Sequence, residues 1–371
     1  MLQFNPMDGE FLNECDDIYF VFLGETFPEY LRSSLALAKQ FGGLRVNLLA
    51  NDKAVSQDIR DLVIFTSVES FYDSSKFEAA AKRISYGPSF RDGFWLKTLE
   101  RFFVLDQFIQ LKGLDKMFHA ELDQLLFRAD QLLFELSFSK KRGLFFPFHN
   151  RNVAVASVFY CNHPAALRSF LDFASEGSIF PNEMALMAEW GRLNPSMVHA
   201  LPTVATALET AFSPLGDIAI LATDETGGGV VDAAQLGQWI GGIDPRNVPA
   251  RTPPSTKFVV PPGELLLTRD QLTRINFSMS MEGNLIGRFD DLFTLKIYNL
   301  HLHSKVHKHL LKSDPKLGAL LWQANQPKAF RLPGTRRAQL VDFVMSRIKM
   351  SLKNCPGLAT TRVGEAVIIS L

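Results

Sequence analysis

Apolar and polar positions follow two alternating patterns along the first half of the chain. Short β-branched and aromatic runs that end at glycine or at polar residues predict strands over residues 17–23, 44–50, 62–65 and 116–120. Between them, apolar residues recur at helical spacing over residues 29–41 and 94–112, and each of these stretches stops at glycine. Strands that alternate with helices of this length predict βαβ units and an α/β fold with a mostly parallel sheet.

The second half of the chain has a less regular pattern. It predicts two strands, 153–160 and 295–303, and four helices, 164–174, 182–192, 233–240 and 338–348. Six prolines between residues 244 and 263 predict a long loop or lid. No internal repeat or low-complexity tract is present, which is typical of a globular body. The apolar segment at 338–348 predicts a C-terminal extension that is helical and packed on that body.

Composition narrows the functional classes. The 371 residues include 39 Lys+Arg and 39 Asp+Glu, so the formal net charge is zero and no basic excess is available to hold nucleic acid. Apolar runs are far shorter than the roughly 20 residues that a membrane-spanning helix needs, and residues 1–10 lack the pattern of a secretory signal. Three widely spaced cysteines give neither a disulfide framework nor a cysteine zinc site. We therefore expect a cytoplasmic protein with no nucleic-acid partner and no transmembrane segment.

Two carboxylates follow the strand predicted at residues 116–120. Glu121 and Asp123 stand at positions i and i+2, where open α/β sheets place their ligands. With a bend between them, both side chains can face one divalent cation and the phosphates that it carries. The alternative is two solvated acids at a strand end, because E-x-D alone is a common sequence.

Four of the eight histidines fall within residues 301–309. His301 and His303 alternate on the strand predicted there, so both side chains point to one face. An imidazole beside a carboxylate pair suits Mn²⁺ better than Mg²⁺, although a buried histidine pair bonded to backbone explains the same spacing. Lys305 adds a point charge of the kind that holds phosphate.

A third candidate is a pair of cations on the helix predicted over residues 94–112. Lys97 and Arg101 lie at i and i+4, on one face of that helix, and could reach a nucleotide. The alternative is a solvated charged face. Other chemistries have less support, since the glycine runs match no phosphate loop and no Gly-x-Ser-x-Gly is present.

Taken in chain order, these segments resemble a GT-A fold glycosyltransferase of the metal-dependent, family 8-like kind. The strand ending at Leu23 and Gly24 is similar to the nucleotide-binding first strand of those enzymes. Four sequence segments resemble more closely those of an uncharacterised bacterial and viral group with E-x-D and H-x-H-S-K motifs. They are FWLKTLERF (94–102), FHAELDQLL (118–126), VVDAAQLGQWIGGID (230–244) and NLHLHSK (299–305). The resemblance implies one GT-A-like domain over residues 1–312, with a nucleotide-binding half of about 1–150 and an acceptor half of about 151–312, followed by the extension at 313–371.

The resemblance also implies a chemistry and its ligands. The donor would be a sugar linked to a nucleoside diphosphate, UDP or GDP, and the acceptor a glycan or another hydroxyl compound. Mn²⁺, or Mg²⁺, would be held by a set drawn from four side chains: Glu121, Asp123, His303 and His301. The donor would be bound by five groups besides Glu121: Leu23, Gly24, Lys97, Arg101 and Lys305. The catalytic candidates are Glu183, Asp232 and Lys305, the last by neutralising the leaving diphosphate.

The chain departs from the family pattern at three places. Glu121 stands where the first aspartate is usual, and Glu183-Met184 replaces the Asp-Gln of an N-D-Q segment. Two histidines compete for one metal position, and we favour His303 because Lys305 follows it closely. Two other classes stay open. One is a GT-A-like binding protein without catalysis, and the other is a hydrolase whose His301 and His303 bind metal away from the carboxylates.

Overall fold

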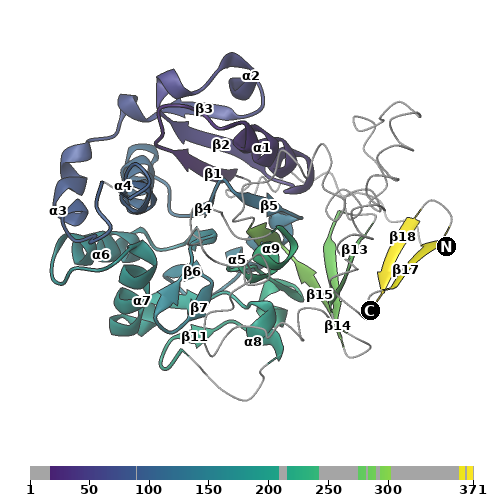
Figure 1. The fold of residues 1–371 in the computed structure, drawn as a ribbon. Helices are drawn as coiled ribbons and strands as arrows, with labels where there is room; N and C mark the ends of the chain where they lie inside the picture. The colour runs from purple at the N-terminus through teal and green to yellow at the C-terminus, as the bar shows by residue number, and fades with distance from the viewer. Residues whose placement is uncertain are drawn as a thin grey trace, which may run out of the picture.

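A mixed eight-stranded sheet forms the centre of the molecule (Figure 1). The computed structural model describes residues 17–88, 90–208, 215–241, 275–280, 283–289, 293–301, 359–363 and 366–370. The strands lie in the order β11-β10-β6-β9-β4-β1-β2-β3, and neighbours are parallel except at β9, which is antiparallel to both β4 and β6. Their bounds are β1 (Asp17–Phe22), β2 (Arg45–Ala50), β3 (Ile64–Ser67), β4 (Met117–Ala120), β6 (Leu144–Phe146), β9 (Val158–Cys161), β10 (Val198–Ala200) and β11 (Ala219–Ile220).

Helices cover both faces of this sheet. The described helices are α1 (Glu29–Phe41), α2 (Gln57–Arg60), α3 (Glu78–Ala81), α4 (Phe94–Lys112), α5 (Ala129–Ser137), α6 (Pro164–Ser175), α7 (Glu183–Leu193), α8 (Val204–Leu208) and α9 (Gln235–Gly241). Side chains alternate along each strand, so Ile18 and Phe20 pack with α1 and α5, whereas Tyr19 and Val21 pack with α4, α6 and α7. The predicted α/β class, a mostly parallel sheet flanked by helices, is confirmed.

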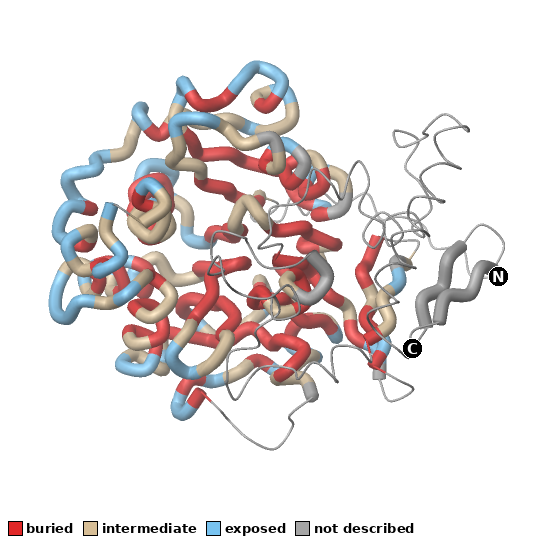
Figure 2. Tube along the Cα trace, in the orientation of Figure 1, coloured by how far each residue is buried: buried red, intermediate tan, exposed pale blue. Residues whose placement is uncertain are grey.

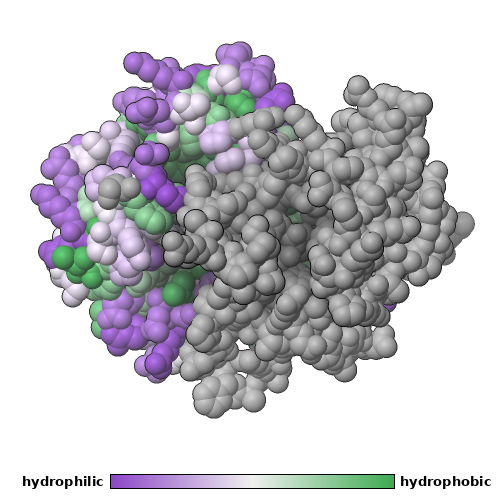
Figure 3. Space-filling model, viewed as in Figure 1, coloured by the Kyte–Doolittle hydropathy of each residue, from purple (hydrophilic) through white to green (hydrophobic). Residues whose placement is uncertain are grey.

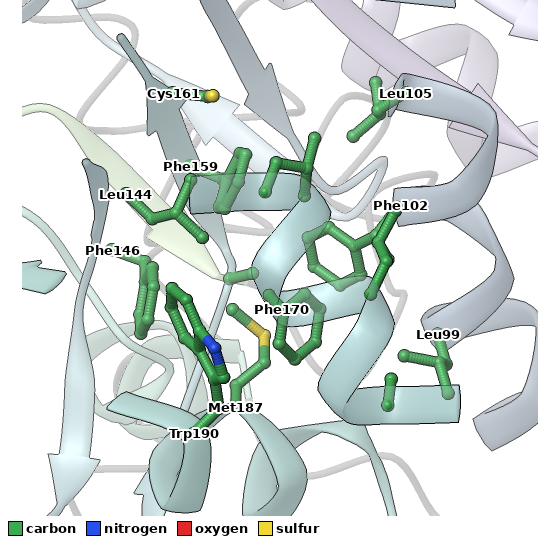
Figure 4. Packing of buried hydrophobic residues seen from close by; sticks show 14 of the residues in the cluster. Leu99, Phe102, Leu105, Leu144, Phe146, Phe159, Cys161, Phe170, Met187 and Trp190 are labelled. Carbon is green, nitrogen blue, oxygen red and sulfur yellow. The ribbon is translucent and has the colours of Figure 1, made fainter. Parts of the chain in front are cut away.

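Phenylalanine fills the layer between the sheet and α4 (Figure 4). Phe102 of α4 packs edge to face on Phe159 of β9 and on Phe170 of α6, with ring centroids 5.4 and 5.6 Å apart. Phe170 in turn contacts Trp190 of α7 at 5.6 Å. Full burial of one such ring contributes roughly 1.5–3 kcal/mol. This packing fixes α4 against the sheet, and it thereby fixes the residues that α4 presents at the strand ends.

The strand order places a crevice at one end of β1. The chain runs outward from β1 through β2 to β3, then returns through α4 to β4 on the other side of β1. Neighbouring connections that leave in opposite directions open a gap beyond the carboxyl ends of the two strands, and open α/β sheets bind ligands there. Figure 2 shows the buried central strands surrounded by more exposed helices and loops.

Smaller sheets accompany the central one. β12 (Gly229–Val230), β15 (Phe293–Ile297), β14 (Leu285–Phe289) and β13 (Ile275–Met279) form a four-stranded sheet. Three two-stranded pairs join β16 (Asn299–His301) to β5 (Gln124–Leu126), β7 (Phe148–Asn150) to β8 (Val153–Ala154), and β17 (Ala359–Val363) to β18 (Ala366–Ser370). On the face in Figure 3, hydrophilic residues cover most of the described outer edge and hydrophobic ones form scattered patches. None of the described helices is long and apolar enough to cross a membrane.

Several sequence predictions can be compared with these bounds. The helices at 29–41 and 94–112 are confirmed at both ends. The single strand expected over 153–160 is wrong in detail, because β8 and β9 are separate strands there. The strand expected over 295–303 is likewise divided between β15 and β16. The helix expected over 338–348 lies outside the described residues, and the described part of the C-terminal extension is the β17–β18 hairpin rather than helix.

Candidate active site

A cleft of about 720 Å³ opens at the carboxyl ends of β1 and β4. The end of β1 contributes Leu23 and Gly24, α4 contributes Lys97 and Arg101, and the start of α7 contributes Glu183. Glu121, Asp123 and His301 complete the predicted residues that line it. The structure therefore brings together eight of the residues singled out in the sequence, at the switch point where a ligand is expected.

The turn between β4 and β5 holds the two carboxylates. The Glu121 N–H donates to the carbonyl of Ser157 at 3.0 Å, and the Gln124 N–H donates back to the Glu121 carbonyl at 3.2 Å. These bonds close a short bend immediately after β4, and both acids line the cleft. Their side chains are only 15% and 13% exposed, which distinguishes them from solvated acids at a strand end.

The pairing of β5 with β16 brings His301 to the same place. His301 lies opposite Gln124 in this antiparallel pair, one residue beyond Asp123. Its Nε2 is 3.2 Å from Glu121 Oε2 and 3.3 Å from Asp123 Oδ1. The ligand atoms of the three residues all lie within 4.8 Å of one another. His301, our second choice, is thus the histidine placed at the carboxylates, while His303 and Lys305 lie outside the described residues.

A backbone carbonyl on the side away from the carboxylates orients the ring of His301. Its Nδ1 lies 3.1 Å from the carbonyl of Ala233, which leaves Nε2 toward the acids. Burial alone would lower the pKa of His301, but the neighbouring carboxylates of Asp123 and Glu121 outweigh burial and raise the pKa to about 9. A histidine whose second nitrogen is held by a carbonyl, with its first nitrogen beside carboxylates, has the arrangement typical of a metal ligand.

Arg101 is tied to the carboxylate cluster. Its Nη1 forms an ion pair with Glu121 Oε1, and the two side chains are 8% and 15% exposed. The opposite oxygen of Glu121 faces His301, so one carboxylate bridges a guanidinium and the candidate metal position. Because both partners are largely removed from water, this pair is screened less than a surface ion pair.

Asp232 does not line the cleft but lies beneath it. Its carboxylate accepts hydrogen bonds from the backbone N–H groups of Ala234 and Leu236 through Oδ1, at 3.0 and 2.9 Å. Through Oδ2 it accepts from Gly237 at 2.7 Å and from His301 at 3.0 Å. With 2% exposure, this aspartate caps α9 and anchors the backbone of His301, so the structure gives it a positioning role instead of contact with an acceptor.

The buried side-chain amide of Asn299 also helps to hold Asp232 in position. Asn299 accepts a hydrogen bond from the Asp232 N–H at 2.9 Å and donates to Gln124 Oε1 at 2.7 Å. Ser157 joins the same network by donating to the Asp232 carbonyl at 3.0 Å. Sequence reasoning missed the role of these polar residues, although an aspartate just before a helix is an N-cap signal that could have revealed it.

Glu183 is a buried acid on the wall of the cleft. It is the first residue of α7, is 2% exposed, and its Oε2 has no hydrogen-bond partner. Burial raises the pKa of Glu183 to about 7, against the opposing effect of the Arg101 charge. A carboxyl group that holds its proton near neutrality can act as acid or base.

The chain has only low similarity to known proteins. No protein-family model and no curated protein matches it. Mouse xyloside xylosyltransferase 1 is 14% identical, with a TM-score of 0.36, over 50% of this chain and 85% of that one. An active-site mutant of LgtC is 12% identical, with a TM-score of 0.36, over 56% and 84%. The glycosyltransferase GlyE of Streptococcus pneumoniae is 14% identical, with a TM-score of 0.32, over 62% and 49%. Likeness at this level assigns no family and no activity, so function has to be argued from the residues themselves.

Proposed function

We propose that this protein is a metal-dependent glycosyltransferase that moves a sugar from a nucleoside-diphosphate donor to a hydroxyl acceptor. The observation that carries the proposal is the cluster of Glu121, Asp123 and His301 at the switch point of the sheet. The order of sequence motifs described above supports the same conclusion independently of that geometry.

The donor set fits a divalent cation. Two carboxylate oxygens and one imidazole nitrogen within 4.8 Å of one another match the ligands that Mn²⁺ accepts, and the carboxylates also suit Mg²⁺. Glu121, Asp123 and His301 would hold the ion, and His303 remains a further candidate. When bound, the metal supplies positive charge that stabilises the leaving diphosphate.

Protein groups around the cluster suit a nucleotide with a diphosphate. Arg101 keeps the Glu121 carboxylate in place, and Lys97 lines the same cleft from the preceding turn of α4. The N-terminal ends of α4 and α7 also face the cleft through Phe94 and Glu183. Positive helix ends add favourable potential for phosphate beyond that of the side chains. Leu23 and Gly24 line the cleft directly after the end of β1.

Glu183 is our candidate for proton handling at the acceptor. Its unpartnered Oε2 lies on the cleft wall, where it would take a proton from an acceptor hydroxyl in an inverting reaction. In a retaining reaction the same carboxylate would instead steady positive charge at the sugar carbon. Asp232 is not proposed in this role, because its oxygens are already occupied by backbone N–H groups.

The two alternative functions, a hydrolase and a binding protein without catalysis, have less support. A hydrolase that uses His301 away from the carboxylates is contradicted, since His301 Nε2 lies within 3.3 Å of both acids. A binding protein without catalysis would bind the nucleotide but not cleave the donor. Hydrolysis assays on a panel of UDP- and GDP-sugars with Mn²⁺ separate these possibilities and identify the donor.

The matched variants are Asp123→Asn and Asp61→Asn. Asp61 is exposed and does not line the cleft, so its variant should hydrolyse the donor like the parent protein. Asp123→Asn should lose at least about tenfold in rate at limiting Mn²⁺, since a metal ligand is removed. Equal loss in both variants, or no hydrolysis of any donor by the parent, would count against the proposal.

A further inference from the structure

Four aromatic side chains form a row that begins in the cleft and ends at the surface. Phe94 and Trp95, the first residues of α4, line the cleft and pack edge to face with ring centroids 4.9 Å apart. Phe90 stacks on Trp95 at 6.2 Å with the ring planes 19° apart, and Tyr86 lies 5.3 Å from Phe90. Tyr86, at the outer end, is 47% exposed. We call these four residues the aromatic row.

The backbone within the aromatic row is strained. Arg91, Asp92 and Gly93, which connect Phe90 to Phe94, have φ angles of 49°, 56° and 74°. Only glycine adopts this left-handed region without cost, yet two of the three residues are not glycine. The Phe90 carbonyl accepts from the Gly93 and Phe94 N–H groups at 3.1 and 3.2 Å and holds the turn. Strained residues concentrate at ligand-binding sites because they orient groups that a relaxed chain would not.

The surroundings of the aromatic row are polar and carry charges of both signs. Ser85, Asp92 and Lys97 are exposed around the rings, and the Arg91 guanidinium stacks over Phe94 at 4.3 Å. Such a surface offers ring faces bordered by hydrogen-bonding groups. A lipid chain would require a continuous apolar patch. A highly charged polymer would require charges of one sign, whereas here the acid Asp92 lies among the cations Arg91 and Lys97. A sugar ring, which has apolar faces and a hydroxyl edge, fits both features.

We propose that the aromatic row binds a neutral oligosaccharide acceptor, with one sugar at Trp95 and Phe94 and successive sugars on Phe90 and Tyr86. A row of rings, rather than a single ring, suits a ligand whose units repeat. The acceptor role rests on the proposed function, whereas carbohydrate binding by the row does not. The inference narrows the acceptor class from any hydroxyl compound to a glycan of several sugars.

Calorimetry with neutral oligosaccharides tests the proposal in the absence of donor and metal. The probes are cello-, malto-, manno- and xylo-oligosaccharides of increasing length. At least one series should bind with an affinity that rises with length. Tyr86→Ala should weaken binding of the longest member about three- to tenfold and leave the disaccharide unchanged, whereas Trp95→Ala should weaken all members at least about tenfold.

Phe138→Ala is the control for the loss of an aromatic side chain. Phe138 is 67% exposed and packs on Phe134 outside the cleft, so its variant should bind the oligosaccharides like the parent protein. Tyr86 is exposed at the end of the row, so its substitution tests the proposal even where Trp95→Ala prevents folding. The proposal is overturned if no series binds, if the affinity does not depend on length, or if Phe138→Ala loses as much affinity as the row variants. Binding of apolar peptides or lipid vesicles in place of glycans would also overturn it.

The donor assay distinguishes this failure from that of the proposed function. If oligosaccharides bind along the aromatic row but no nucleotide sugar is hydrolysed, the protein is a carbohydrate-binding protein and the transferase proposal fails alone. If donors are hydrolysed but no oligosaccharide binds, the transferase proposal holds and the aromatic row is not its acceptor site.

Discussion

Replacement of Asp232 by asparagine separates a positioning role from a catalytic one. The Asp232 carboxylate accepts four backbone N–H groups, two at each oxygen, at 2.7–3.0 Å. In Asp232→Asn one oxygen becomes an amide NH₂ group, which cannot accept. If the amide replaces Oδ2, the N–H groups of Gly237 and His301 lose their acceptor and face another donor.

The size of the effect follows from these bonds. A buried N–H without an acceptor costs about 1–3 kcal/mol, so two of them cost about 2–6 kcal/mol. Neutralising a carboxylate that is 2% exposed removes a desolvation penalty and offsets part of that cost. We therefore expect the free energy of unfolding to fall by about 2–4 kcal/mol. Displacement of His301 should also weaken Mn²⁺ binding about 10- to 100-fold.

Urea denaturation and Mn²⁺ titration of donor hydrolysis measure the two effects. The control is Asp224→Asn, since Asp224 is exposed and accepts a single N–H, from Glu225, at 3.1 Å. Its free energy of unfolding should change by less than about 0.5 kcal/mol. If Asp232→Asn unfolds at the parent's urea midpoint but has no activity at saturating Mn²⁺, Asp232 acts on substrate and the positioning role is refuted.

Three further predictions follow from the same region. Gly237→Ala places a Cβ 2.0 Å from the backbone oxygen of His301 and should lower the free energy of unfolding in urea by about 1–3 kcal/mol. The control is Gly191→Ala, whose Cβ lies 3.4 Å from its nearest neighbours, which are side-chain atoms, and which should destabilise the fold much less. Equal destabilisation by the two variants would contradict the packing argument. For Glu183, the rise in pKa from 4.5 to about 7 means that the folded state retains its proton longer, so the free energy of unfolding falls as pH increases between those values. Glu183→Gln removes this decline and should exceed the parent by about 1–3 kcal/mol at pH 8 but not at pH 4; parallel curves would contradict the burial of a titrating group. Mn²⁺ should raise the melting temperature of the parent protein but not of His301→Ala, and an equal rise in both would show that the ion binds elsewhere.

The sequence predicts those parts of the fold that are governed by local patterns. α1 and α4 each carry an apolar stripe over several turns and end at glycine, so periodicity alone locates both ends. A short apolar run followed by two acids predicts β4 and the carboxylates after it. The crevice could be expected as soon as strands and helices were seen to alternate, because connection rules restrict how such a chain can fold.

The arrangement of the candidate site could be predicted only in part. The choice between His301 and His303 depends on how β5 pairs with β16, and two three-residue strands far apart in sequence carry too little pattern to fix that register. The sequence resemblance implies a catalytic role for Asp232, whereas the structure shows that its carboxylate accepts backbone N–H groups. The bonds from Ala234, Leu236 and Gly237 are local, and a helix N-cap pattern could have indicated them. The burial of Asp232 and its bond from the His301 N–H depend on tertiary contacts that no local pattern reveals.

Calorimetric titration of UDP and GDP, with and without Mn²⁺, tests whether Glu121, Asp123 and His301 hold a metal ion and a diphosphate. One nucleotide should bind with a stoichiometry of one in the presence of Mn²⁺ and at least about tenfold more weakly without it. Asp123→Asn should lose the metal-dependent part of the affinity. Absence of binding by both nucleotides with Mn²⁺, or binding that is unchanged by Mn²⁺ and by Asp123→Asn, would contradict the assignment of Glu121, Asp123 and His301 as a metal–diphosphate site.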